Sequence, residues 1–125
     1  MKINISDSEM KVMEKVWECG EMIAVADIVT SLNKDGETWT HQTVGTFLKR
    51  LETKGMVASS KKGKSLYYFP LLSKEQFYSK EAEHFLQSKF KGSLKNFLSA
   101  FSSGKKLSED EIKDLKDWFN DINHK

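Results

Sequence analysis

The chain has 125 residues, of which 38% are hydrophobic and 30% are charged, a balance typical of a folded domain with a buried core. Its single cysteine excludes an internal disulfide and a zinc site built from cysteines. No apolar run approaches the roughly 18 residues of a membrane-spanning helix, and residues 1–9 lack the apolar segment of a signal peptide. We therefore expect a cytoplasmic protein with no direct membrane insertion.

The net charge of +2 is small, but the charges are unevenly distributed along the chain. Residues 1–40 carry four lysines against eight acids, and residues 71–125 carry ten lysines against nine acids. Residues 41–70 carry five lysines and one arginine against a single glutamate. This concentration of positive charge predicts that one edge of the protein faces a polyanion.

The N-terminal part of the chain is predicted to form two helices followed by a loop. Ser6 and Glu9 have the spacing of a capping box, which starts a helix at Ser6, and Gly20 ends it. A shorter helix covers Ala24–Asn33, and the composition of residues 33–37 predicts a loop. The inward-facing apolar residues of the two helices are Met10, Met13, Val16, Trp17, Ile28, Val29 and Leu32.

The next stretch, Thr40–Lys54, has apolar residues at i, i+3, i+4 and i+7, the spacing of one face of a helix. Thr40 can cap the start of this helix, and Trp39 can pack on Val44 as a hydrophobic staple. Gly55 follows the last turn, where a left-handed residue is commonly needed. The apolar residues of this face are Val44, Phe47, Leu48 and Leu51.

The opposite face of this third helix is polar and basic. Its amide, hydroxyl, ammonium and guanidinium groups are the chemistry that reads base edges and holds phosphates in DNA. Taken alone, the stretch is more simply interpreted as a solvated amphipathic helix, and the segment after it changes that interpretation. The outward residues are Gln42, Thr46, Lys49 and Thr53, with Gly45 and Arg50 on the flanks.

After Gly55 the apolar period changes from 3.6 to 2, which predicts strands at Met56–Ser60 and Ser65–Phe69. Residues 61–64 between them, Lys-Lys-Gly-Lys, form a hairpin turn with glycine where a positive φ is required. A lysine-rich turn can serve solubility alone. Because this one directly follows a basic amphipathic helix, we interpret the hairpin as the wing of a winged helix-turn-helix domain.

The remainder of the chain is helical. Capping boxes at Ser73 and Ser108 start two of its helices, and Gly92 and Ser102–Gly104 break it between them. The last helix has apolar residues spaced 3, 4 and 3 apart, as in a coiled-coil seam. No other layer remains to cover this seam, so we expect a partner subunit to cover it. The predicted dimer-interface residues are Phe85, Leu86, Phe90, Leu94, Phe97, Leu98, Phe101, Ile112, Leu115, Phe119 and Ile122.

These patterns predict a mainly α protein with a small β-hairpin wing. A winged helix-turn-helix DNA-binding domain would cover residues 1–72, and a C-terminal helical dimerisation arm would cover residues 73–125. The expected partners are double-stranded operator DNA and a second copy of the chain.

Four stretches in this order resemble the penicillinase and methicillin-resistance repressors of Gram-positive bacteria, which are related to copper-responsive operon repressors. They are ISDSEMKVMEKVWECGEMIAVADIV, TWTHQTVGTFLKRLETKGMV, KKGKSLYYFPLLSKEQF and the tail LSEDEIKDLKDWFND. The resemblance implies a dimeric winged-helix repressor that binds a palindromic operator, of a resistance or stress operon, and blocks transcription.

The resemblance also implies which residues contact DNA. By position, the family contacts fall on Gln42, Thr43, Gly45, Thr46 and Arg50, and on the wing. Many relatives have proline, lysine and arginine where this chain has His41, Gln42 and Gly45, so the family's operator sequence is not transferred. The full predicted DNA-binding set is Thr40, His41, Gln42, Thr43, Gly45, Thr46, Lys49, Arg50, Lys61, Lys62 and Lys64.

In the antibiotic-responsive members, induction proceeds through a membrane-bound sensor with a zinc metalloprotease domain, and the repressor is cut in its arm. Alignment places the bond at Ala100–Phe101, with alanine where the family has asparagine; the pair Asn96–Phe97 lies one turn earlier. The segment Ser99–Gly104 is either protease-accessible chain or an ordinary loop between helices. The copper branch carries a CxC pair that this chain lacks, which excludes copper sensing by that route.

No enzyme motif is present, since the chain has no Walker loop, HExxH or GxSxG, and its three histidines lack metal-ligand spacing. We expect no enzymatic activity, no cofactor and no metal. The alternative to a repressor is a winged-helix adaptor that contacts proteins without DNA. Salt dependence distinguishes the two, because affinity for DNA falls steeply with salt.

Overall fold

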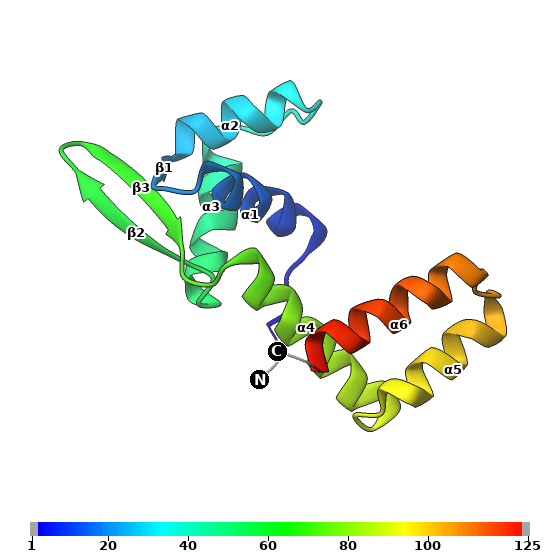
Figure 1. The fold of residues 1–125 in the computed structure, drawn as a ribbon. Helices are drawn as coiled ribbons and strands as arrows, with labels where there is room; N and C mark the ends of the chain where they lie inside the picture. The colour runs from blue at the N-terminus through cyan, green and yellow to red at the C-terminus, as the bar shows by residue number, and fades with distance from the viewer. Residues whose placement is uncertain (1–2, 124–125) are drawn as a thin grey trace. The chain divides into compact units, whose positions relative to one another are not determined.

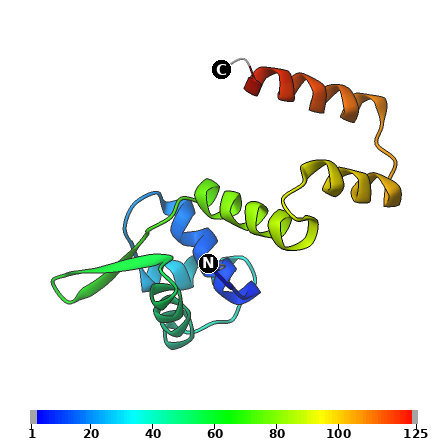
Figure 2. The same ribbon diagram turned by 90° about the horizontal axis from the view of Figure 1, so that it is seen from below.

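The structure is a computed structural model and describes residues 3–123 (Figures 1 and 2). The chain divides into two compact units, Met1–Glu81 and Ala82–Lys125, and the long helix α4 belongs partly to each. In chain order the elements are α1 Asp7–Cys19, β1 Ile23–Ala24, α2 Val25–Lys34, α3 His41–Thr53, β2 Val57–Lys62, β3 Ser65–Pro70, α4 Lys74–Phe90, α5 Leu94–Gly104 and α6 Glu109–Asn123.

The first unit packs three helices against a small sheet, as expected for a winged helix. Helix α1 starts with the predicted capping box: the Ser6 N–H donates to Glu9 Oε1 at 2.9 Å, and the Glu9 N–H donates to Ser6 Oγ at 3.1 Å. Gly20 ends the helix at φ +72°. Trp17 and Met10, predicted to face inward, are only partly buried at the edge of the core. The buried apolar residues are Val12, Met13, Val16, Ile28, Val29, Leu32, Val44, Leu48, Leu51, Met56, Val57, Tyr68 and Phe77.

The sheet is antiparallel and has three strands in the order β1-β3-β2. Strand β1 consists of Ile23 and Ala24, which pair with Tyr68 and Tyr67 of β3. The sequence pattern did not predict this strand, because two residues carry no alternation of their own and only the pairing with β3 defines them. Ala24, expected to start the second helix, is its N-cap.

The β2–β3 hairpin, called the wing below, is longer than predicted. Lys61 and Lys62 lie in β2 and pair with Leu66 and Ser65, so the turn is formed by residues 63–64 and not by 61–64. Gly63 has φ +63°, as predicted for this position. A two-residue turn with glycine first matches the twist of the flanking strands, which extends the pairing to Lys62.

The first turns of α4 pack on the winged-helix unit. The Trp17 indole N–H donates to the Leu72 carbonyl at 2.9 Å, and the Trp17 ring lies 5.9 Å from that of the buried Phe77. The compact unit therefore ends at Glu81, nine residues beyond the predicted domain boundary at residue 72. The predicted boundary did not account for the apolar contacts of this helix with α1.

In the second unit, α5 continues through Ser102–Gly104, so the predicted helix break at these residues is wrong. The Ser102 and Ser103 hydroxyls donate to the Ser99 and Ala100 carbonyls at 3.2 and 2.9 Å, and the chain leaves the helix only at Lys105. Hydroxyls that bond back to the preceding turn allow serine to remain inside a helix. Within residues 3–123, no helix is long and apolar enough to cross a membrane.

Candidate nucleic-acid interface

The candidate interface begins at the start of α3, which Thr40 caps as predicted. Thr40 Oγ1 accepts the Thr43 N–H at 3.2 Å and lies 3.2 Å from Thr43 Oγ1. Both hydroxyls are thus engaged in starting the helix. Trp39, expected to contact Val44, has its ring 5.2 Å from that of Phe47. His41 and Gln42 follow the cap and are exposed.

The outward face of α3 presents exposed polar side chains, as the helical spacing predicts. The Thr46 hydroxyl donates to the Gln42 carbonyl at 2.9 Å, and the Thr53 hydroxyl donates to the Lys49 carbonyl at 3.1 Å. The threonine protons are therefore satisfied within the helix. This leaves the Gln42 amide and the Lys49 ammonium as the hydrogen-bond donors on this face that are free to bond to a ligand.

Gly45 lies on the same face, in an ordinary helical conformation. A Cβ at this position would have nothing within 4 Å, apart from the backbone of its own helix. The fold therefore does not require glycine here, although glycine weakens the helix by about 1 kcal/mol relative to alanine. A glycine without a packing role is compatible with close approach of a ligand to the backbone.

The end of α3 is anchored by backbone and side-chain contacts. Gly55 has φ +80°, and the N–H groups of Gly55 and Met56 donate to the carbonyls of Glu52 and Leu51 at 3.0 and 2.9 Å, which is a Schellman motif. The neighbouring Lys54 ammonium bonds to Glu9 Oε1 at 2.7 Å. Lys54 is therefore the one basic residue of 41–70 that the described residues pair with an acid.

The remaining cations of the segment are exposed. Among residues 3–123, no acid forms an ion pair with Lys49, Arg50, Lys61, Lys62 or Lys64. Arg50 lies with its guanidinium carbon 5.9 Å from the centre of the Phe47 ring, within the range of a cation–π contact. Five unpaired cations on one helix and the adjacent hairpin form a surface suited to phosphate groups.

Glu52 is the only acid in the basic segment, and it joins α3 to the wing. The Ser59 hydroxyl donates to Glu52 Oε2 at 3.0 Å. Burial raises the pKa of the nearby Tyr68 hydroxyl, and the negative charge of Glu52 raises it further. The hydrogen bond connects the wing to the helix that carries the polar face.

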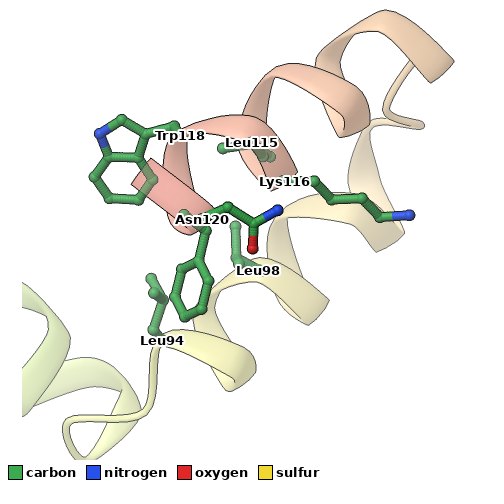
Figure 3. Close-up of a pocket in the computed structure, with 7 residues that line it drawn as sticks. Leu94, Leu98, Leu115, Lys116, Trp118 and Asn120 are labelled. Atoms are coloured by element: carbon green, nitrogen blue, oxygen red, sulfur yellow. The ribbon is translucent and has the colours of Figure 1, made fainter. Parts of the chain in front are cut away.

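The second unit has a large apolar surface. Figure 3 shows Leu94 and Leu98 of α5 and Leu115 of α6 around an apolar groove, with Trp118 projecting from α6 at its side. Trp118 is 56% exposed, the largest exposed fraction among the large apolar residues. It was absent from the predicted interface because the 3-4-3 seam does not include it. The seam residues themselves, Ile112, Leu115, Phe119 and Ile122, are all exposed in the single chain.

The family model of penicillinase repressors matches residues 5–121, nearly the whole chain. The chain belongs to the penicillinase repressor family. It is 30% identical over 111 residues to the penicillinase repressor of Bacillus licheniformis, covering 89% of this chain and 85% of the relative. It is 27% identical over 116 residues to the methicillin resistance regulatory protein MecI of Staphylococcus aureus strain N315, covering 93% of each chain.

Solved structures of one repressor support the winged-helix fold. The DNA-binding domain of the repressor BlaI matches with a TM-score of 0.52 and 33% identity, over 60% of this chain and 90% of that one. The monomeric form of Bacillus licheniformis BlaI in complex with the blaP half-operator matches with a TM-score of 0.50 over the same shares. The predicted family and fold are confirmed, and the relatives are transcriptional repressors, a class without enzymatic activity.

The cleavage position that the family resemblance predicts for this chain falls on exposed residues of α5. Ala100 and Phe101 both lie inside the helix, and the Phe101 ring lies 6.3 Å from the Phe97 ring. The segment Ser99–Gly104 is thus neither open chain nor a loop. Across residues 3–123, no group of three or more histidine, cysteine or acidic side chains could hold a metal ion.

Proposed function

We propose that this chain is a dimeric transcriptional repressor that binds a palindromic operator of a resistance or stress operon. The observation that carries the proposal is the exposed polar face of α3, continued by unpaired cations on the wing. In this proposal Gln42 contacts base edges in the major groove, while Lys49, Arg50 and one or more lysines of the wing contact phosphates.

A related protein supports this assignment. The BlaI structure named above was determined with a DNA half-operator, and it matches 60% of this chain with 33% identity. The family resemblance implies lysine and arginine in many relatives where this chain has Gln42 and Gly45, so we expect the base preference of this chain to differ.

Dimerisation through the second unit would supply the two-fold symmetry of a palindromic operator. The exposed apolar residues of α5 and α6 are the surface for this contact, since they have no covering layer among the described residues. Two joined recognition helices would read half-sites about 34–36 Å apart, or a multiple of that distance. Joining two weakly binding DNA-binding units raises the effective concentration of the second unit at its half-site once the first is bound.

Relief of repression by proteolysis of the arm is the remaining part of the proposal. The bond between Ala100 and Phe101 is exposed but lies in α5, and proteases act on extended chain. The final turns of α5 would therefore have to unwind locally before cleavage. A membrane-bound metalloprotease sensor is the expected partner for that step.

The test is a selection of binding duplexes from a random library, followed by gel-shift titration of the full chain at several salt concentrations. We expect tight binding whose log–log salt slope is about −0.9 for each phosphate contact. A variant with Leu115→Asp and Phe119→Asp, both exposed in the single chain, should sediment as a monomer and bind far more weakly. Absence of salt-dependent binding by the unchanged chain would instead favour the adaptor without DNA.

A further inference from the structure

The two faces of the wing are different, and the strand register assigns each residue to one of them. Residues directly opposite each other in an antiparallel pair share a face, and successive residues alternate between faces. Ser59 pairs with Tyr68, and Lys61 pairs with Leu66 two positions further along, so these four share one face. Lys62 pairs with Ser65 on the other face.

The face with Ser59 and Tyr68 is turned toward the core and α3. Tyr68 is 2% exposed, and Ser59 bonds to Glu52 of α3 at 3.0 Å. Lys61 and Leu66 continue this face toward the free end of the hairpin, which extends beyond the three helices in both views (Figures 1 and 2). They therefore lie on the α3 side of the wing, whereas Lys62 lies on the opposite side.

Leu66 is an apolar side chain in this basic setting. It is 40% exposed, and it lies beyond the hydrophobic core, between Lys61 across the strand pair and Lys64 in the turn. It is not among the apolar residues that form the hydrophobic core or pack against it. Proteins that enter the minor groove often place an apolar side chain against the bases there, with cations on the phosphates at its edges.

We propose that Leu66 contacts the floor of the minor groove next to the major groove occupied by α3, while Lys61 neutralises a phosphate at its edge and Lys62 takes no part. The inference rests on the proposed function and assigns a contact residue to it. The Leu66 contact makes the chain prefer A·T pairs at that position, because the 2-amino group of guanine would obstruct an apolar contact in the minor groove.

The first test changes the chemical groups in the minor groove of the DNA independently of those in the major groove. Pairs flanking each half-site of the selected duplex are changed in turn to A·T, to inosine·cytosine or to G·C. Inosine·cytosine lacks the guanine amino group, so its minor groove resembles A·T while its major groove resembles G·C. We expect the full chain to bind the A·T and inosine·cytosine duplexes alike, and about ten-fold more tightly than G·C, the size of one lost base-pair preference.

The variant is Leu66→Ser, with Leu71→Ser as the matched control because Leu71 is 52% exposed and lies outside the wing. Leu66→Ser should bind all three duplexes with the affinity for G·C, while Leu71→Ser and the conservative Leu66→Met should keep the preference. A preference retained by Leu66→Ser, or inosine·cytosine binding like G·C, would overturn the inference. If the unchanged chain binds no duplex, the proposed function fails first.

The second test uses the two neighbouring lysines of β2. Lys61→Ala and Lys62→Ala remove the same charge from adjacent exposed positions on opposite faces. We expect Lys61→Ala to reduce the salt slope on the A·T duplex by about 0.9, one phosphate contact, and Lys62→Ala to leave it unchanged. Equal slopes for the two variants would overturn the assignment of faces.

Discussion

Lys54, the C-cap of α3, places its ammonium 2.7 Å from Oε1 of Glu9 in the first turn of α1. Glu9 is 2% exposed, and the same oxygen accepts the Ser6 N–H at 2.9 Å. Glu9 Oε2 is buried without a hydrogen-bond partner among the described residues. The position of α3, the helix that carries the polar face, therefore depends on the buried Glu9 carboxylate and its ion pair with Lys54.

Removing that cation is expected to destabilise the protein. Lys54→Met leaves the Glu9 charge buried and unpaired, and we expect the free energy of unfolding to fall by about 2 kcal/mol, less than for a fully enclosed pair because a third of Lys54 is exposed. Lys11→Met is the control, since Lys11 is 53% exposed and pairs with Glu37 at the surface; its loss should stay below about 0.5 kcal/mol. Urea titrations followed by circular dichroism measure both, and equal losses would contradict the role assigned to Glu9.

The same pair predicts how stability depends on pH. Burial raises the pKa of Glu9, but hydrogen bonds from Lys54 and Ser6 outweigh it, so the folded pKa lies below the ordinary value. The stabilisation is therefore fully present above the unfolded pKa, near 4.3, and is lost as pH falls through the folded pKa. The difference in urea midpoint between the unchanged chain and Glu9→Gln should shrink between about pH 6 and pH 3. A constant difference over this range would show that Glu9 does not titrate with folding.

Gly45→Ala should change stability and DNA affinity in opposite directions. The new methyl group meets nothing within 4 Å, so we expect about 1 kcal/mol of added stability from the better helix former. Affinity for the selected duplex should fall, because the methyl group would occupy space that DNA approaches. Thermal unfolding and gel shifts measure the two effects. Gly104→Ala on α5, where a Cβ would also meet open space, serves as the control and should leave DNA affinity unchanged. If Gly45→Ala raised both stability and DNA affinity, Gly45 would not lie in the DNA interface.

Trp118→Ala should weaken the dimer without unfolding the chain. The side chain is largely exposed beside the groove in Figure 3, so its loss removes no core contact, while a buried aromatic is often the strongest single contribution to an interface. Sedimentation equilibrium should show at least a ten-fold rise in the dimer dissociation constant, about 1.4 kcal/mol. Lys113→Ala, on the opposite face of α6 by helical spacing, is the control. An unchanged dimer in Trp118→Ala would place the interface elsewhere.

The sequence by itself determined the helix starts and the third-helix face. All three predicted capping boxes are present, at Ser6, Ser73 and Ser108. A capping box needs only two side chains three residues apart, so local chemistry is sufficient to place it. The buried stripe Val44, Leu48 and Leu51 likewise follows from helical spacing alone. The individual DNA contacts and the residues of the dimer interface remain predictions.

Only the tertiary structure decided the features that depend on residues distant in sequence. Ile23 and Ala24 form a strand because β3 lies beside them, and Phe77 extends the first unit because α1 covers it. Glu9 occupies a capping-box position, which is typical of an exposed residue. It is nevertheless buried, because Lys54, 45 residues away, supplies its counter-charge. Strand pairing and burial of this kind arise when segments distant in sequence come into contact, and a local sequence pattern does not predict which segments will do so.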